Sequence, residues 1–119
     1  MINKMILDPE TLFKALADET RLRSILMLVA EGELCVCELG FVLDVSQPKI
    51  SRHLATLRNI KLVTVRRQQV WMFYKLNSDL PVWITNILNE TIAGLGENNF
   101  LANDLKKLKT MPARPEHCS

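Results

Sequence analysis

The chain has 119 residues, of which 48% are hydrophobic and 24% charged, with a net charge of +2 at pH 7. This length and composition indicate one globular domain with short extensions, and they exclude a disordered or low-complexity chain. No apolar run reaches the roughly 18–20 residues of a membrane span, and the first ten residues lack the apolar core of a secretory signal. We therefore expect a cytoplasmic protein with no membrane partner.

The chain begins with two expected helices, at residues 8–17 and 18–30, each with apolar residues at helical spacing. Pro9 suits the start of the first helix, and either Thr20 or Asp18 could cap the second. Residues 34–43 predict a third, short helix in which Gly40 allows a neighbouring element to approach closely. A tight turn then leads into the next helix.

Residues 46–60, SQPKISRHLATLRNI, predict a helix with an apolar back and a cationic front. Ser46 is a good N-cap, and Ile50, Leu54 and Leu57 repeat at the spacing of one buried stripe. Two short helices joined by a tight turn, the second of them basic, are typical of a helix-turn-helix, whose second helix enters the DNA major groove. The residues of this helix expected to contact DNA are Gln47, Lys49, Ser51, Arg52 and His53.

Residues 62–65 and 70–76 alternate β-branched and aromatic residues and predict two strands of a hairpin. The segment between them, Arg66-Arg67-Gln68-Gln69, lacks the Gly or Asn of a tight turn, so we expect a longer or looser loop. A basic hairpin directly after a helix-turn-helix forms the wing of a winged helix. Arg66 and Arg67 are the expected DNA contacts of this wing.

Charge is unevenly distributed along the chain. From Val45 to Ser78 there are seven cations and no Asp or Glu. A polyanion is the natural partner of such a stretch, and with a helix-turn-helix inside it the expected partner is double-stranded DNA. The seven cations are Lys49, Arg52, Arg58, Lys61, Arg66, Arg67 and Lys75.

Residues 79–96 predict a long helix whose apolar residues cover more than one face. One face packs on the domain, and the surplus is expected to pack against a second copy, giving a homodimer. Residues 100–109 predict another short helix, followed by a flexible tail. The expected fold is thus mainly α with a small β-hairpin. A winged helix-turn-helix domain, including the dimerisation helices, spans residues 1–97, and a short extension with the flexible tail spans residues 98–119.

The chain has three cysteines, Cys35, Cys37 and Cys118. An odd number in a reducing compartment argues against a disulfide framework. Cys35 and Cys37 lie at the start of the third expected helix, where the helix N-terminus lowers thiol pKa values, so we expect both to ionise readily. Thiolates select soft ions, which points to As(III) or Sb(III).

The spacing of the two thiols also predicts a mechanism. Residues two apart on an α-helix differ by about 200° in direction, so the sulfurs of Cys35 and Cys37 are expected to point apart. Binding one ion must then unwind the first turn. Because this helix supports the DNA-reading helix, ion binding and DNA binding are expected to oppose each other.

Four stretches, LADETRL, GELCVCEL, SQPKISRHLATL and VWMFYKL, together resemble the ArsR/SmtB family of metal-sensing repressors, and most closely its arsenic-responsive ArsR branch. The resemblance implies a homodimeric repressor of an arsenic-resistance operon that needs no cofactor. The resemblance further implies that this repressor leaves operator DNA when As(III) or Sb(III) binds. By position, Cys35 and Cys37 match the first two arsenic ligands of that branch, whereas Gly40 occupies the place of the third. Either Cys118 supplies the third ligand, or a small thiol or hydroxide completes the shell.

Other interpretations stay open. A thiol redox switch would oxidise Cys35 and Cys37 in place of binding a metal. The cadmium and lead sensors of the family share ELCVC but add cysteines near the N-terminus, and no Cys precedes Cys35 here. The family's zinc site uses His on the last long helix, and residues 79–96 contain none. An enzyme, such as a thiol-dependent arsenate reductase, is disfavoured because the chain has neither a Gly-rich anion loop nor a βαβ pattern.

Overall fold

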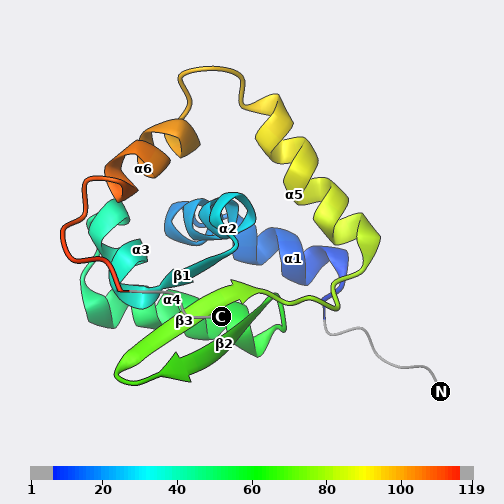
Figure 1. Cartoon of the computed structure of the whole chain (residues 1–119). Coiled ribbons are helices and arrows are strands. Elements are labelled where there is room, and N and C mark those ends of the chain that lie inside the picture. Colours follow the sequence, from blue (N-terminus) through cyan, green and yellow to red (C-terminus); the bar gives the residue numbers. More distant parts are fainter. Residues whose placement is uncertain (1–6, 116–119) are drawn as a thin grey trace.

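The computed structural model describes residues 7–115. These residues form a mainly helical fold with one small antiparallel sheet, and α2 lies at its centre (Figure 1). The elements in chain order are α1 (Pro9–Leu16), α2 (Glu19–Glu31), β1 (Glu33–Cys35), α3 (Val36–Leu43), α4 (Gln47–Asn59), β2 (Val63–Gln68), β3 (Trp71–Leu76), α5 (Val82–Gly94) and α6 (Phe100–Leu108).

The core is built around α2, whose residues 25–28 are at most 1% exposed. Asp18 caps this helix by accepting a hydrogen bond from the backbone N–H of Arg21 at 3.0 Å. Gly32 ends it with a φ of 90°, a conformation that favours glycine. Asp8 caps α1 in the same way. The first two helices therefore form where the sequence predicts them, to within a residue.

The helices α3 and α4 form the predicted helix-turn-helix. Asp44, with a φ of 56°, turns the chain between them. A Cβ atom on Gly40 would lie 3.2 Å from the carbonyl oxygen of Val45, which confirms that glycine permits a close approach here. Ser46 occupies the N-cap position of α4, although its side chain makes no capping hydrogen bond. The predicted stripe of Ile50, Leu54 and Leu57 is fully buried.

The sheet has one strand more than the sequence indicates. Its order is β1-β3-β2, and Cys35 of β1 pairs with Phe73 of β3. The helix expected to begin at Leu34 therefore begins at Val36, because pairing with β3 holds the backbone of Cys35 extended (φ −78°, ψ 152°). This pairing joins segments about forty residues apart in sequence, so local helical periodicity does not detect it.

The hairpin turn is tighter than expected. The ladder between β2 and β3 continues to the pair Gln68–Trp71, which leaves only Gln69 and Val70 for the turn. Gln69 adopts a φ of 57°, so this turn uses the left-handed region without a glycine. The prediction of a longer loop is wrong, and Arg66 and Arg67 lie within strand β2.

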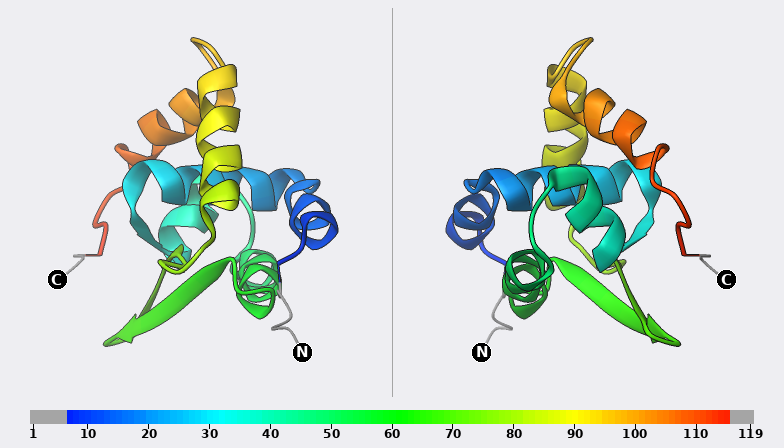
Figure 2. Two further views of the ribbon diagram at one scale, coloured as in Figure 1. Left: turned by 90° about the vertical axis from the view of Figure 1, so that its right-hand side faces the viewer. Right: turned by 90° about the vertical axis from the view of Figure 1, so that its left-hand side faces the viewer.

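Helix α5 begins at Val82, later than expected, because Pro81 takes the N-cap position and disfavours helix in the residue before it. It stands out from the rest of the fold and packs against α2 (Figures 1 and 2). Helix α6 forms as predicted and packs on α2 and α3. Among the described residues, no helix combines the length and apolar character needed to cross a bilayer.

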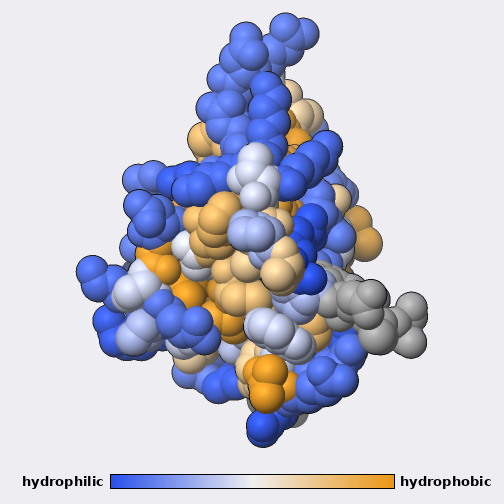
Figure 3. All heavy atoms as spheres, turned by 60° about the vertical axis from the view of Figure 1, so that its left-hand side comes forward, coloured by the Kyte–Doolittle hydropathy of each residue, from blue (hydrophilic) through white to orange (hydrophobic). Residues whose placement is uncertain are grey.

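One ion pair fixes α6 to α2. The guanidinium of Arg23 donates to both carboxylate oxygens of Asp104, at 3.0 and 2.6 Å. On the face that bears α3 and α6, apolar side chains gather in the middle and hydrophilic ones surround them (Figure 3). The described part of the C-terminal extension, residues 98–115, thus packs on the helix-turn-helix, and the contact between Arg114 and Glu38 brings it close to the start of α3.

Candidate DNA interface and thiol site

The front of α4 and the hairpin lie at the same end of the molecule, at the bottom of both views in Figure 2. Gln47, Lys49 and Arg52 are exposed on α4. Lys49 and Arg52 project away from its buried stripe, whereas Gln47 flanks the stripe. Arg67 is exposed on β2, where its Nε atom donates to the backbone carbonyl of Gln69 at 3.1 Å. This arrangement brings exposed cations from the helix and the hairpin to one surface.

His53 lies at the edge of this surface and contacts α2. Its Nδ1 atom is 3.2 Å from a guanidinium nitrogen of Arg21 and 3.9 Å from Oδ1 of Asp18. Because Asp18 also caps α2, His53 joins the DNA-reading helix to the start of the central helix. Ser51 is half-buried and faces a hollow beside the cysteines.

Arg66, the second predicted wing contact, is engaged within the protein. Its guanidinium forms two hydrogen bonds with the Glu33 carboxylate, at 2.7 and 2.8 Å, and lies 4.6 Å from the ring centroid of Phe73. Phe73 pairs with Cys35 across the sheet, and Glu33 lies two residues before Cys35 in β1. Arg66 thus links the wing to the strand that carries the first cysteine.

The two thiols touch each other. Because Cys35 is the extended N-cap residue of α3 and Cys37 lies inside the helix, their side chains converge, and the Cys37 Sγ donates to the Cys35 Sγ at 2.7 Å. The Cys35 sulfur also accepts from the backbone N–H of Cys37 at 3.3 Å. The prediction that the sulfurs point apart is wrong, since it assumed that both residues are helical. No unwinding is needed to bring them together.

The expected ionisation of Cys37 is also wrong. Burial raises the pKa of Cys37 from 9.0 to about 12, and the hydrogen bond to Cys35 and the nearby charges of Cys35 and Glu38 act in the same direction. These effects outweigh the hydrogen bond from the helix backbone, which lowers the pKa. At neutral pH the Cys37 side chain is therefore a protonated thiol.

The thiol pair and the DNA-reading helix share a hollow of about 250 Å³. Cys35 and Cys37 form one wall, Gln47 and Ser51 of α4 form another, and the hairpin closes the third side. The hairpin residues that line it are Val70, Trp71, Met72 and Tyr74. An ion held by the two sulfurs would thus lie beside the first turns of α4.

A buried carboxylate supports the thiol pair. Glu38 is 0% exposed, and its Oε1 atom accepts from the backbone N–H of Cys35 at 2.7 Å, completing a capping box. Its Oε2 atom accepts from Nε of Arg114 at 2.7 Å. Within residues 7–115 no group of three His, Cys, Asp or Glu side chains is placed to hold a metal ion. Cys118, one of the two alternatives for the third ligand, lies outside the described residues.

Glu33 and Glu38 flank the cysteines in the sequence, but the contacts that they and Arg114 make are not predicted from it. Glu38 had a detectable signal, because it stands three residues after the N-cap, as Glu does in a capping box. Here a cysteine takes the place of the usual Ser or Thr. Glu33 and Arg114 had none, since their partners are 33 and 76 residues away.

The fold and this surface define the class of protein: a winged helix-turn-helix DNA-binding regulator with a thiol pair behind its recognition helix. Residues 18–65 match the family described as bacterial regulatory protein, arsR family. The chain is 46% identical over 110 residues to the arsenic resistance transcriptional regulator ArsR2 of Pseudomonas putida. The matched region covers 92% of this chain and 94% of that protein. The chain belongs to the arsR family, whose members are transcriptional regulators and not enzymes.

Other relatives agree with this assignment. The chain is 54% identical over 82 residues to the arsenical resistance operon repressor of Escherichia coli, covering 69% of this chain and 70% of that protein. Among solved structures, HlyU from Vibrio cholerae is 36% identical with a TM-score of 0.63, covering 71% of this chain and 87% of that one. These matches support the winged-helix fold along most of the described chain.

Proposed function

We propose that this protein represses an arsenic-resistance operon and leaves its operator when As(III) or Sb(III) binds Cys35 and Cys37. The observation that carries this proposal is the contact between the two thiols in a hollow that they share with Gln47 and Ser51. The relatives named for arsenic resistance support the same inducer. Repression requires operator binding without inducer, for which the exposed cations of α4 and the wing are suited.

The DNA contacts we propose form a main group and a secondary group. Lys49, Arg52 and Arg67 are exposed and make the main phosphate or base contacts, with Gln47 at the start of the recognition helix. Ser51, His53 and Arg66 already have neighbours within the protein, so they contact DNA only as secondary partners or after these contacts rearrange.

Coupling between the sites does not require the helix to unwind. An ion on the two sulfurs occupies the hollow beside α4 and strains both Cys35 in β1 and Cys37 in α3. Through β3 and the Glu33–Arg66 pair, a shift of β1 also moves the wing. The bound inducer then favours an arrangement in which α4 and the wing no longer fit one face of the DNA. Because the two binding equilibria are linked, bound DNA lowers the affinity for the ion by the same factor as the ion lowers the affinity for DNA.

The third arsenic ligand we propose is Cys118. Two thiols alone leave one position of a pyramidal As(III) for hydroxide or a small thiol. A third sulfur from the same chain binds at an effective concentration of about millimolar, even on a tail. Cys118 therefore affects affinity more than the ability to respond.

The test is a fluorescence anisotropy titration of labelled duplex DNA from the region upstream of the chain's own coding sequence, with a scrambled duplex as control. As(III), Sb(III), Cd(II) and Zn(II) are added in turn. As(III) and Sb(III) should release the DNA.

Cys35→Ser and Cys37→Ser should each bind DNA normally but should not release it when As(III) is added. Cys118→Ser should need at most about ten-fold more As(III), equivalent to about 1.4 kcal/mol. A normal arsenite response in both Cys35→Ser and Cys37→Ser would contradict the site.

We further propose that the working unit is a homodimer. The winged-helix domain of residues 1–97 supplies its contacts through α1 and α5, and residues 98–119 form the extension. Phe13 on α1 and Val82 on α5 are large apolar side chains that are 52% and 70% exposed, and a second copy packed on these helices would cover them. Two recognition helices about 34–36 Å apart would then contact an inverted repeat.

A redox switch is the second candidate, favoured by the same contact between the two sulfurs. With hydrogen peroxide as oxidant, the two thiols lose their protons and one electron pair to form a disulfide, and the peroxide is reduced to water. Release of DNA by As(III) under a reductant supports the arsenite sensor. Release by peroxide alone, reversed by a dithiol, supports the redox switch. Release by Cd(II) but not As(III) would favour a cadmium- or lead-type sensor.

A further inference from the structure

The segment after α6 returns to the thiol-bearing helix. It runs from Lys109 to Pro115 along the side of α3, drawn in red in Figures 1 and 2. Ala113 turns its backbone with a φ of 52°, a left-handed conformation that is uncommon for residues other than glycine. Arg114 then contacts α3, and Pro115 is buried. The chain therefore does not leave the domain at the end of α6.

Two contacts fix α6, from which this segment starts. Arg23 of α2 pairs with Asp104, and the Nζ atom of Lys107 lies 5.5 Å from the ring centroid of Phe41 in α3, within the range of a cation–π contact. Because α6 is anchored on both α2 and α3, the segment begins from a fixed point. Its docking thus continues the packing of α6 along α3.

One buried carboxylate joins the segment to the cysteine pair. Glu38 is 0% exposed, and it accepts from Arg114 with one oxygen and from the backbone N–H of Cys35 with the other, at 2.7 Å each. A buried carboxylate is stable when a cation compensates its charge and hydrogen bonds satisfy its oxygens. Docking of the segment therefore stabilises the carboxylate that holds the Cys35 N–H.

The arrangement of the two sulfurs depends on the backbone that Glu38 holds. The sulfurs lie 2.7 Å apart because Cys35 is extended whereas Cys37 is helical. The hydrogen bond from the Cys35 N–H to Glu38 fixes the point where the extended backbone becomes a helix. Two ligands that are already held together bind one ion more tightly, since less freedom is lost on binding. A movement of this first turn would separate the sulfurs and weaken chelation.

We propose that Arg114 is a positioning residue of the thiol site, which by pairing with Glu38 keeps Cys35 and Cys37 arranged to bind one trivalent arsenic through both sulfurs. The inference rests on the proposed function, because this thiol pair is the proposed arsenic site. Arg114 needs no contact with the arsenic. Groups that orient metal ligands typically change affinity by about 10–100-fold when they are removed, and we expect about tenfold for Arg114→Ala.

A bidentate arsenical tests the proposal on the two described thiols alone. In Cys118→Ser chains, Cys35 and Cys37 are the remaining cysteines. Phenylarsine oxide keeps its phenyl group and forms one As–S bond to each sulfur, while its oxygen leaves as water with the two thiol protons. Competition with dithiothreitol measures its affinity. Arg114→Ala should weaken binding about tenfold. Lys109→Ala, which removes an exposed cation from the same segment, should leave it unchanged.

Two further variants separate positioning from a general loss of stability. Arg114→Lys keeps a cation that can donate to Glu38, so it should restore most of the affinity. Glu38→Gln keeps an acceptor for the Cys35 N–H but carries no charge that needs a cation. The double variant Arg114→Ala/Glu38→Gln should therefore bind phenylarsine oxide more tightly than Arg114→Ala alone. Circular dichroism establishes that each variant is folded.

The DNA-release assay gives an independent readout. Arg114→Ala should raise the As(III) concentration for half release about tenfold and leave operator affinity without inducer unchanged. A matching loss of operator affinity without inducer would mean that Arg114 only supports the DNA-reading helix, which contradicts a positioning role at the thiols.

The remaining outcomes are distinct. Equal affinities for phenylarsine oxide with and without Arg114 would overturn its positioning role. They would leave the arsenite proposal standing, because that proposal depends on the responses of Cys35→Ser and Cys37→Ser. A double variant no tighter than Arg114→Ala would also overturn the role, since the uncompensated charge of Glu38 would then not be the cause of the weaker binding.

Discussion

Cys35 combines two roles that a pair of substitutions can separate. Its sulfur caps α3 by accepting from the Cys37 N–H, and it is a proposed arsenic ligand. Serine is a preferred N-cap, so Cys35→Ser should leave the free energy of unfolding within about 0.5 kcal/mol, whereas Cys35→Ala should cost about 1 kcal/mol. Urea denaturation measures both. Neither variant should release DNA on addition of As(III), and an arsenite response in Cys35→Ser alone would mean that an oxygen ligand suffices.

The raised pKa of Cys37 predicts how the free energy of unfolding changes with pH. The folded state raises this pKa to about 12 from 9.0 and so favours the neutral thiol. The resulting stabilisation is fully present below about pH 9 and is lost as the pH rises toward 12. The difference in unfolding free energy between the wild type and Cys37→Ser should therefore be constant from pH 6 to 8 and shrink above pH 9. Denaturation of both chains across this range checks it, and a constant difference up to pH 11 would contradict it.

The same protonated thiol bears on ion selectivity. Arsenous acid, As(OH)₃, is uncharged near neutral pH, and each As–S bond forms as a thiol proton leaves with a hydroxide as water. A divalent cation must instead release the Cys37 proton into solvent, which is costly at pH 7 for a pKa of about 12. We expect the As(III) concentration for half release of DNA to change little from pH 6 to 8. Any Cd(II) response should strengthen steeply with pH, and anisotropy titrations at three pH values distinguish the two patterns.

At the scale of elements, the sequence predicts the helices well because their signals are local. Asp8 and Asp18 cap α1 and α2, and Ile50, Leu54 and Leu57 form the buried stripe of α4. Strand β1 has no local sequence signal, because its stability comes from pairing with β3. The prediction that the Cys35 and Cys37 sulfurs point apart is wrong for the same reason, since Cys35 is extended and its side chain turns toward Cys37.

The two adjacent arginines of the wing should behave differently when replaced by alanine. Arg66 is paired with Glu33 and is 38% exposed, so Arg66→Ala should lower the unfolding free energy by about 0.5–1 kcal/mol. Arg67 is exposed beside the turn, so Arg67→Ala should leave stability unchanged and reduce the dependence of log K on log[salt] by about one. Urea denaturation and anisotropy at several salt concentrations measure the two effects. Equal behaviour of both variants would contradict these roles.

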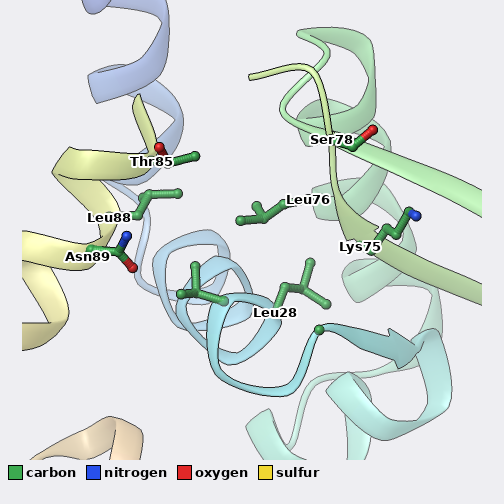
Figure 4. Close-up of a pocket in the computed structure, with 9 residues that line it drawn as sticks. Leu28, Lys75, Leu76, Ser78, Thr85, Leu88 and Asn89 are labelled. Carbon is green, nitrogen blue, oxygen red and sulfur yellow. The ribbon is translucent and has the colours of Figure 1, made fainter. Parts of the chain in front are cut away.

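At the scale of the whole molecule, α5 is only partly covered. Leu28 of α2, Leu76 at the end of β3 and Leu88 of α5 point toward a common hollow of about 420 Å³ that one chain leaves unfilled (Figure 4). On another face of α5, Ile87 lies half-buried among Asn86, Glu90 and Thr91. A helix with apolar residues on several faces is stable in water when a second surface covers them.

The proposed dimer gives the last prediction. Ile87→Glu places a carboxylate on this half-covered face of α5, where burial against a second copy would desolvate it, so the variant should be a monomer at micromolar concentration. Lys106→Glu introduces the same group on the exposed side of α6 and should leave the dimer intact. Sedimentation equilibrium measures the mass, and circular dichroism establishes that Ile87→Glu is folded. The monomer should also lose most of its operator affinity, because it contacts only one of two half-sites about 34–36 Å apart. A wild-type monomer that binds its operator tightly would refute the dimer.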